Sequence, residues 1–396
     1  MTAMKIGEIT QIKSGYAFQS KCFNEEERGM PLIRIRDVGK NNPKTYYEGD
    51  YSEEYIVKKG DFLISMDGEF KISQWKGKTA LLNQRVCRIE ANERFIDSKY
   101  IYYFLPRELQ KIEDTTSFVT VKHLSVKQIR DIEVSLPPIE EQKKIVAVLD
   151  KAQSLIEKRK EVLVKLEEAL QSFYLTTVGS GAKNYRQWEK KKIEDLSLAE
   201  KGSMRTGPFG SDLKHSEFVN EGIAVLGIDN AVNNRFSWGE RRFITEEKYI
   251  QLKRYTVKPK DVIITIMGTT GRSAVVPDDI PLAITTKHLA TITLNDKVAL
   301  PEFISFSIHS NQYILKQIQK ANKGAIMNGL NLGIIKKLEI YLPPMNEQKK
   351  FLDFYSNYQS LKYNLTKSLV TLEDNFNSLL QRAFKDELKI NVEITA

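Results

Sequence analysis

Apolar residues recur at alternating spacings of four and three along two long segments of the chain. In the first segment, which only Arg159 interrupts, they fall at Ile145, Leu149, Ala152, Ile156, Leu163, Leu166, Leu170 and Phe173. In the second, which only Lys362 interrupts, they fall at Phe351, Tyr355, Tyr358, Leu365, Leu369, Leu372, Phe376 and Leu379. A stripe held over about four heptads is typical of a coiled-coil seam and predicts two helices that bury each other. The stripe would also suit a helix that packs on the core of its own domain.

The two segments are copies of one unit. The sequence LPPIEEQKK at residues 136–144 returns as LPPMNEQKK at residues 342–350, which is 206 positions later. The double proline suits the end of a strand and the first turn of a helix, where a missing N–H costs nothing, and the acidic residues that follow favour a helix N-terminus. A repeat at one fixed offset predicts two half-chains, each a globular domain followed by a helix.

Each globular domain combines strands with short helices. Apolar and polar residues alternate over residues 31–38 and 223–230, which is the period of a half-buried strand. A basic turn that ends in aspartate leads into a buried strand in residues 57–65 and again in residues 257–265. Other expected elements are helices at residues 98–109 and 301–320, and a helical turn followed by a strand at residues 124–136. The fold class is therefore α+β, with two tandem mixed α/β domains that each precede a long helix.

The domain boundaries follow from these patterns. Gly179-Ser180-Gly181 is a flexible breaker that ends the first helix and begins a linker. We predict a first domain at residues 1–138, its helix at 139–178, a second domain at 183–344, its helix at 345–385, and a C-terminal tail at 386–396.

Charge indicates the class of partner. The chain of 396 residues carries a net charge of +9. Lys and Arg outnumber Asp and Glu by 22 to 20 in residues 1–138 and by 24 to 17 in residues 183–344, whereas residues 139–178 hold seven of each sign. Basic domains on a neutral scaffold suit a polyanion, although many cytosolic proteins are equally basic. Two unpaired cysteines, no apolar run of membrane length and no signal-peptide pattern favour the cytoplasm and no membrane.

We find no catalytic constellation in the sequence. Gly77-Lys78-Thr79 resembles the end of a phosphate-binding loop, but Ile72 stands where the first glycine is required. The LPP sequences lack the polar residue and the aromatic that base methylation needs around its prolines. The four histidines are scattered without zinc-ligand spacing, so no metal site is expected. The acidic residues of 67–71 suit a solvated turn better than a metal-dependent nuclease.

Two domains that each end in LPP-x-x-EQKK and a heptad helix resemble the specificity subunit of type I restriction–modification enzymes. The resemblance covers nearly the whole chain. It implies two target recognition domains, helices paired antiparallel as a spacer, and no catalysis by this subunit. It also implies double-stranded DNA as a ligand, with two modification subunits and restriction or translocase subunits as partners. S-adenosylmethionine, ATP and Mg²⁺ would then bind those partners, and this chain would need no cofactor.

Candidate DNA-binding residues follow from the family pattern and from residue chemistry, because Arg and Asn suit bidentate contacts to bases. The first set lies in glycine-containing loops: Gly15, Tyr16 and Phe18, with Gly207, Phe209 and Ser211. The second set ends the next strand: Arg34 and Arg36, with Asn230. The third follows the buried strand: Lys71, Gln74, Trp75 and Lys78, with Thr269, Thr270 and Arg272. The last precedes the end of each domain: Lys122, with Lys323 and Asn328. The family often shows Thr-Asn-Gln in the next strand, which Asn83-Gln84 keeps in part and Thr286-Lys287-His288 does not, so Lys287 and His288 have less weight.

Two alternatives remain open at this point. A specificity subunit of another restriction–methylation type would have the same fold but a fused partner enzyme. A coiled-coil adaptor with an incidental basic surface would not bind DNA at all.

Overall fold

The computed structural model describes residues 2–116, 122–322 and 329–384 and divides into two compact units. Unit 1 is Met1–Lys160 with Lys367–Ala396, and unit 2 is Glu161–Thr366. Each unit therefore combines one globular domain, the beginning of the helix that follows it, and the end of the helix from the other half-chain. The expected C-terminal tail, 386–396, lies outside the described residues.

Over residues 2–116 and 122–138, the domain of unit 1 carries eleven strands and three helices before the first long helix. The strands are β1 Thr2–Lys5, β2 Thr10–Ser14, β3 Phe23–Asn24, β4 Met30–Ile33, β5 Tyr46–Tyr47, β6 Ile56–Val57, β7 Phe62–Ser65, β8 Ile72–Gln74, β9 Ala80–Leu82, β10 Val86–Ala91 and β11 Glu133–Leu136. The helices are α1 Ile6–Ile9, α2 Ser98–Thr115, α3 Val126–Arg130 and the long α4 Ile139–Thr177, with 3₁₀ turns at Ser20–Cys22, Ile35–Asp37 and Glu53–Tyr55.

Unit 2 repeats this order with small changes. Its strands are β12 Lys190–Lys192, β13 Met204–Thr206, β14 Ile223–Leu226, β15 Phe243–Ile244, β16 Val262–Thr265, β17 Ser273–Val275, β18 Ala283–Thr285, β19 Leu289–Ile292 and β20 Glu339–Tyr341. Its helices are α5 Glu246–Leu252, α6 Pro301–Ser310, α7 Gln312–Asn322, α8 Leu332–Lys337 and the long α9 Met345–Ala383. Turns of 3₁₀ helix occur at Tyr185–Gln187, Ile193–Leu196, Gly210–Asp212, His215–Glu217, Ile228–Asn230 and Lys253–Tyr255.

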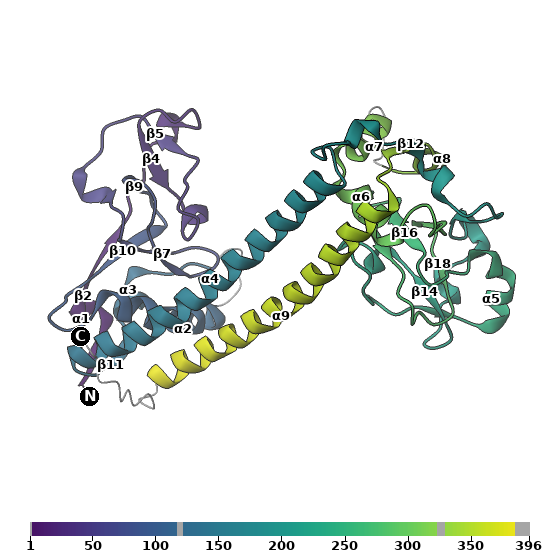
Figure 1. The fold of residues 1–396 in the computed structure, drawn as a ribbon. Helices are drawn as coiled ribbons and strands as arrows, with labels where there is room; N and C mark the ends of the chain where they lie inside the picture. Colours follow the sequence, from purple (N-terminus) through teal and green to yellow (C-terminus); the bar gives the residue numbers. More distant parts are fainter. Residues whose placement is uncertain (1, 117–121, 323–328, 385–396) are drawn as a thin grey trace. The chain divides into compact units, whose positions relative to one another are not determined.

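The two domains share a four-stranded sheet, while their second sheets differ in size; Figure 1 labels β7 and β10 of the first domain and β16 of the second. Unit 1 has an antiparallel sheet in the order β2-β10-β7-β8, and unit 2 has β13-β19-β16-β17. A second sheet, β3-β5-β4-β9-β6 in unit 1 and β15-β14-β18 in unit 2, contains one parallel pair, β4 with β9 or β14 with β18. The strand before each long helix pairs with a strand at the start of its domain, β11 with β1 and β20 with β12. The repeat in sequence is thus a repeat in topology.

The long helices join the core of each unit. In unit 1, Ile145 and Leu149 at the start of α4 belong to the same apolar cluster as Ala383 at the end of α9. In unit 2, Tyr174 at the end of α4 and Phe351 at the start of α9 are fully buried in one cluster. The apolar stripe therefore packs on the domain core at these turns, as the alternative interpretation of the stripe expected.

The stripes of α4 and α9 also pack on each other within unit 2 (Figure 1). The Phe173 and Phe354 rings stack with centroids 4.0 Å apart, and the Lys362 ammonium binds the Glu167 carboxylate. Residue numbers fall along α4 as they rise along α9, so these segments run antiparallel. In unit 1, where the other ends of the helices lie, Lys160 Nζ is 2.7 Å from a Glu373 carboxylate oxygen. All predicted stripe residues are buried or half-buried, which fits a helix-on-helix seam.

Some elements differ from the expectation. The strand expected over 31–38 ends at Ile33, because the Asp37 carboxylate accepts the Arg34 N–H and folds the chain into a 3₁₀ turn. The helix expected at 301–320 is divided into α6 and α7 at Asn311, whose side chain binds the Tyr174 hydroxyl at 3.0 Å. Within the described residues, the helices are too short or too polar to cross a membrane.

Candidate nucleic-acid interface

The turn at residues 83–85, between β9 and β10, gathers the candidate loops of unit 1. We call it, with its counterpart at residues 286–288 in unit 2, the hub turn. The Asn83 N–H donates to the Ile33 carbonyl at 3.3 Å, which places the end of β4 beside the turn. The Gln84 N–H donates to the Tyr16 carbonyl at 2.8 Å, which places the glycine loop beside the turn as well.

Two further loops reach the hub turn of unit 1. The Met66 N–H donates to the Arg85 carbonyl at 2.8 Å, and the Leu124 N–H donates to the Met66 carbonyl at 2.7 Å. The Gly68 N–H donates to the carbonyl of Lys122 at 3.0 Å. Four segments that are distant in sequence therefore converge on one edge of the domain, where loops are free to vary.

Unit 2 repeats three of these backbone bonds at the corresponding edge. The bonds are Thr286 N to Leu226 O (2.8 Å), Ile266 N to His288 O (2.9 Å) and Leu330 N to Ile266 O (2.9 Å). The two domains thus share a frame at the hub turn, while the side chains on this frame differ.

The loop glycines are required by packing against the hub turn. A Cβ on Gly15 would lie 2.1 Å from the Asn83 carbonyl oxygen. A Cβ on Gly207 would lie 2.3 Å from the Thr285 carbonyl oxygen. Any side chain would force the loop away from the turn, so this close approach explains both glycines without a phosphate.

A buried hydroxyl shapes the loop after the central strand in both units. Ser65 and Thr265 are fully buried at the ends of β7 and β16. Each hydroxyl donates to one carbonyl and accepts one N–H inside its own loop. Ser65 donates to the Glu69 carbonyl at 2.7 Å and accepts the Lys71 N–H at 3.0 Å. Thr265 donates to the Thr269 carbonyl and accepts the Arg272 N–H at 3.0 Å. The side chains of Lys71 and Arg272 remain exposed, so the loop presents a cation in each unit.

Most of the predicted DNA-binding residues lie at or next to this edge. They are Gly15, Tyr16, Arg34, Lys71 and Lys122 in unit 1, and Gly207, Phe209, Thr269, Thr270 and Arg272 in unit 2. Tyr16 and Phe209 are 51% and 57% exposed, as a ring that stacks on a base must be. Ser211 lies in the 3₁₀ turn Gly210–Asp212. Lys323 and Asn328 lie outside the described residues.

Other predicted residues lie elsewhere or are occupied. Gln74 donates to the Gly60 carbonyl at 3.2 Å, at the opposite end of β7 from the hub turn. Trp75 is 1% exposed, and its indole N–H donates to the Lys78 carbonyl at 2.8 Å. Phe18 is buried among tyrosines. We assign these residues to the structure of the domain.

The acidic and amide residues after β4 and β14 serve their own turns. Asp37 is buried, and desolvation raises the pKa of its carboxyl group. Asn230 is 1% exposed; its side chain accepts the Gly227 N–H at 2.8 Å and donates to the Ser237 carbonyl at 2.9 Å. The Arg36 guanidinium donates to the Thr45 hydroxyl at 2.9 Å, so Arg34 keeps the freer side chain of the pair.

Sequence reasoning missed the side chains of the hub turn itself. Arg85 is not among the predicted residues, and Lys287 and His288 have little weight because they depart from the family pattern. Lys287 is exposed, and partial burial of His288 together with the Lys287 charge lowers the histidine pKa, so a neutral imidazole is expected at pH 7. Only the adjacency of Arg85 to Asn83-Gln84 could have identified it from sequence.

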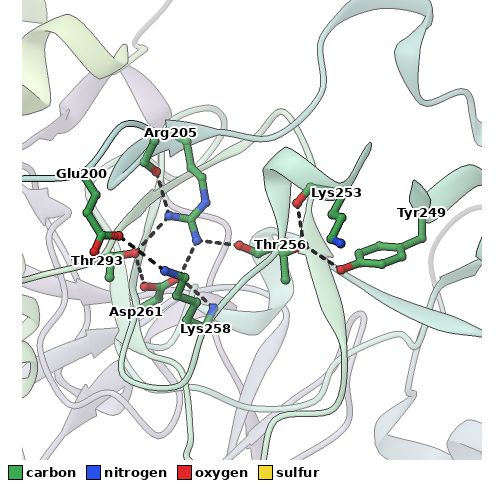
Figure 2. A network of polar contacts seen from close by, with 9 residues as sticks. Glu200, Arg205, Tyr249, Lys253, Thr256, Lys258, Asp261 and Thr293 are labelled. Carbon is green, nitrogen blue, oxygen red and sulfur yellow. Dashed lines mark hydrogen bonds and ion pairs between the residues drawn. The ribbon is translucent and has the colours of Figure 1, made fainter. Parts of the chain in front are cut away.

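The repeated turn that ends in aspartate is a structural clamp (Figure 2). The Asp261 carboxylate accepts the Lys258 N–H at 2.9 Å and binds the Arg205 guanidinium at 2.5 Å. The guanidinium also donates to the Thr256 carbonyl at 2.6 Å. In unit 1, Asp61 accepts the Lys58 N–H in the equivalent turn, and the arginine that binds it and the Ile56 carbonyl is Arg88 on β10, which is not the strand equivalent to β13. The turn is thereby fixed to its sheet.

The glutamine of LPP-x-x-EQ joins each domain to its helix. Gln142 is fully buried; its side-chain oxygen accepts the Asp97 N–H at 2.9 Å, and its amide donates to the Phe95 carbonyl at 3.0 Å and the Pro137 carbonyl at 2.9 Å. Gln348, also fully buried, makes the same three contacts in unit 2: Leu300 N (2.9 Å), Val298 O (3.2 Å) and Pro343 O (2.9 Å). The motif thus connects the helix start to the loop before α2 or α6.

The described residues offer little for catalysis. Among them, no three His, Cys, Asp or Glu side chains lie together as a metal would require. His309 lies 3.1 Å from the Ser273 hydroxyl, but burial lowers the histidine pKa to about 4, and that hydroxyl donates to the Ser305 carbonyl. This pair joins β17 to α6.

A family model described as the type I restriction modification DNA specificity domain matches residues 1–168 and 185–372. The specificity subunit of the type I restriction enzyme EcoBI of Escherichia coli is 29% identical, over 97% of this chain and 85% of its own. That of the MjaVIII enzyme of Methanocaldococcus jannaschii is 23% identical, over 78% of this chain and 75% of its own.

Solved structures share the fold. The S subunit of a type I restriction–modification system from M. genitalium matches with a TM-score of 0.56 and 15% identity, over 97% of this chain and 96% of its own. A chain from a study of assembly and conformational transition in the type I system matches with a TM-score of 0.60 and 14% identity, over 98% of both chains.

Proposed function

The chain belongs to the type I restriction–modification DNA specificity family, and we propose that each of its two domains reads one half of a bipartite DNA target. It is a specificity subunit with two tandem recognition domains, the non-catalytic component of such a system. This excludes the adaptor alternative and favours type I over the other restriction–methylation types.

The observation that carries the proposal is the shared frame at the hub turn. Two domains that share three backbone bonds at this turn and differ in their exposed side chains can read two different sequences in one manner. Unit 1 offers Tyr16, Lys71 and Arg85 on this frame, and unit 2 offers Phe209 and Arg272. Cations suit the phosphates and guanine, and exposed rings suit stacking or thymine methyl groups.

We propose that α4 and α9 set the spacer between the two half-sites. The buried glutamines Gln142 and Gln348 fix each recognition domain to the start of its helix. A helix of 39 residues is about 58 Å long, which exceeds one turn of B-DNA, about 34 Å.

Two modification subunits would bind equivalent surfaces of the two helices. Leu155 on α4 and Leu361 on α9 are 206 positions apart, and each is 48% exposed. Val164 and Val370 have the same relation, with 58% and 53% exposure. Exposed apolar residues at repeated positions suit two copies of one partner. Those subunits would methylate adenine with S-adenosylmethionine, and restriction subunits would use ATP and Mg²⁺, all in the cytoplasm.

The test is a domain exchange. Residues 1–138 are replaced by the equivalent domain of another specificity subunit, the chain is expressed with its modification subunits, and methylated DNA of the host is sequenced. One half of the methylated motif should change while the other half and the spacer remain. A matched exchange of residues 183–344 should change only the other half. A change in both halves, or in neither, would refute the two-reader proposal.

A further inference from the structure

Arg85 and His288 occupy the same place in the two hub turns. The carbonyl of each accepts an N–H from the loop after the central strand, at 2.8 Å from Met66 and at 2.9 Å from Ile266. The backbone frame is therefore common to both domains, while the side chain is charged in one and a partly buried imidazole in the other. A position of this kind is where two readers of different half-sites must differ.

The Arg85 side chain is held by two loops. Its Nε is 3.5 Å from one carboxylate oxygen of Asp67, and the other oxygen is 2.6 Å from His123 Nδ1. Its Nη1 lies 3.3 and 3.4 Å from the two ring nitrogens of His123, so it rests against the ring instead of binding a single nitrogen. We call these three residues the Arg85 cluster.

Stability does not account for the Arg85 cluster. The Arg85 side chain is 51% exposed and that of His123 is 47% exposed, and ion pairs at such positions add little. Arg85 also has a φ of +73°, a left-handed conformation that favours glycine or asparagine and costs free energy for arginine. An arginine that is strained, exposed and oriented at a loop edge suggests a binding role.

We propose that Arg85 reads a guanine in the half-site of the first recognition domain, with Asp67 and His123 as positioning residues. The inference rests on the proposed function. Asp67 faces Nε and the His123 ring lies against Nη1, so Nη2 and the second proton of Nη1 remain for the O6 and N7 acceptors of guanine. A planar fork held in one orientation loses less freedom when it binds a base edge than a mobile side chain does.

Unit 2 provides the internal comparison. His288 has no guanidinium group. Because its pKa is lowered, the neutral ring offers one donor and one acceptor. The second domain therefore reads its half-site without a counterpart of Arg85. Variants at Arg85 should leave the second half of the motif unchanged.

The experiment uses the full chain with its modification subunits and sequences the methylated DNA of the host. Arg85→Lys keeps the charge but removes the fork, so one G·C position of the first half-site should lose discrimination by about 5- to 150-fold, from the free energy of one bidentate pair. Asp67→Asn should relax the same position to a smaller extent. Arg94→Ala is the matched control, because it removes an exposed arginine at the opposite end of β10.

Three outcomes would overturn the inference: an unaltered first half-site in Arg85→Ala, a loss of discrimination at several positions at once in Arg85→Lys, or an equal effect of Arg94→Ala. Thermal unfolding of each variant shows whether a change in methylation results from lost folding. If Arg85→Ala does not fold, the methylation pattern of Arg85→Lys decides whether Arg85 reads the guanine. If the exchange of residues 1–138 changes the first half-site while Arg85→Ala does not, only the role of Arg85 fails. If that exchange has no effect, the proposed function fails as well.

Discussion

Replacing Gln142 by leucine tests whether the repeated motif joins the recognition domain to its helix. Leucine has a similar size but can make none of the three side-chain hydrogen bonds of Gln142. The Asp97 N–H, the Phe95 carbonyl and the Pro137 carbonyl, which this side chain binds at 2.9, 3.0 and 2.9 Å, would lose this partner.

The magnitude follows from these bonds. A hydrogen bond contributes about 0.5–1.5 kcal/mol net, and a buried group left without its partner costs about 1–3 kcal/mol. Three bonds to three backbone groups at a fully buried side chain place the loss near 3 kcal/mol. For a unit of this size, that corresponds to a decrease in Tm of about 6–12 °C.

The assay is calorimetric unfolding of the full chain, together with the methylated motif of a host that expresses the variant. We expect the transition of unit 1 to move down while that of unit 2 remains, and spacer lengths to become more varied as the joint loosens. Gln153→Leu on the same helix is the control; its amide donates to Glu157 at 3.4 Å at the surface, so a change under about 0.5 kcal/mol is expected. Equal stability of the two variants would refute the assigned role.

Three further predictions follow from the fold. Changing Leu155 and Leu361 together to aspartate should weaken binding of the modification subunits by tenfold or more in a titration while Tm is kept, and full assembly would contradict the shared docking surface. Inserting four residues after Arg159 and after Leu365, the same heptad position in each helix, should lengthen each by about 6 Å. The spacer of the methylated motif should then grow by about two base pairs. An unchanged spacer would show that the helices do not set the distance between the half-sites. Gly15→Ala should lower Tm and abolish methylation that depends on the first half-site. The reason is that the new Cβ would lie 2.1 Å from a carbonyl oxygen of the hub turn. Normal methylation would show that the loop can move away from the turn without loss of function.

The parts of the fold that could be predicted from sequence are those that depend on local periodicity. Heptad spacing located both long helices, and the exact repeat of LPP-x-x-EQKK located their starts. The strand over 31–38 was predicted too long, because alternation of apolar and polar residues does not reveal that the Asp37 carboxylate will fold the chain at Arg34.

The site was predicted as loops and not as side chains. The alignment of the two copies selected loops that follow strands, but their meeting at one edge is visible only in the backbone bonds around the hub turn. Asp67, Arg85 and His123 come from three separate segments, and no spacing in one sequence connects them. Asn230 and Trp75 were predicted as contacts because of residue type, and only burial reveals that their polar groups are already bound.

The core of unit 1 closes on residues from both ends of the chain. Ala383 is 3% exposed within it, and Phe384 packs on the Tyr100 and Phe104 rings with centroids 5.2 and 5.5 Å apart. During synthesis on the ribosome, the first domain emerges long before these residues exist. It must wait with an uncovered apolar face until all of unit 2 has been made, so the domain translated first is the last to be completed.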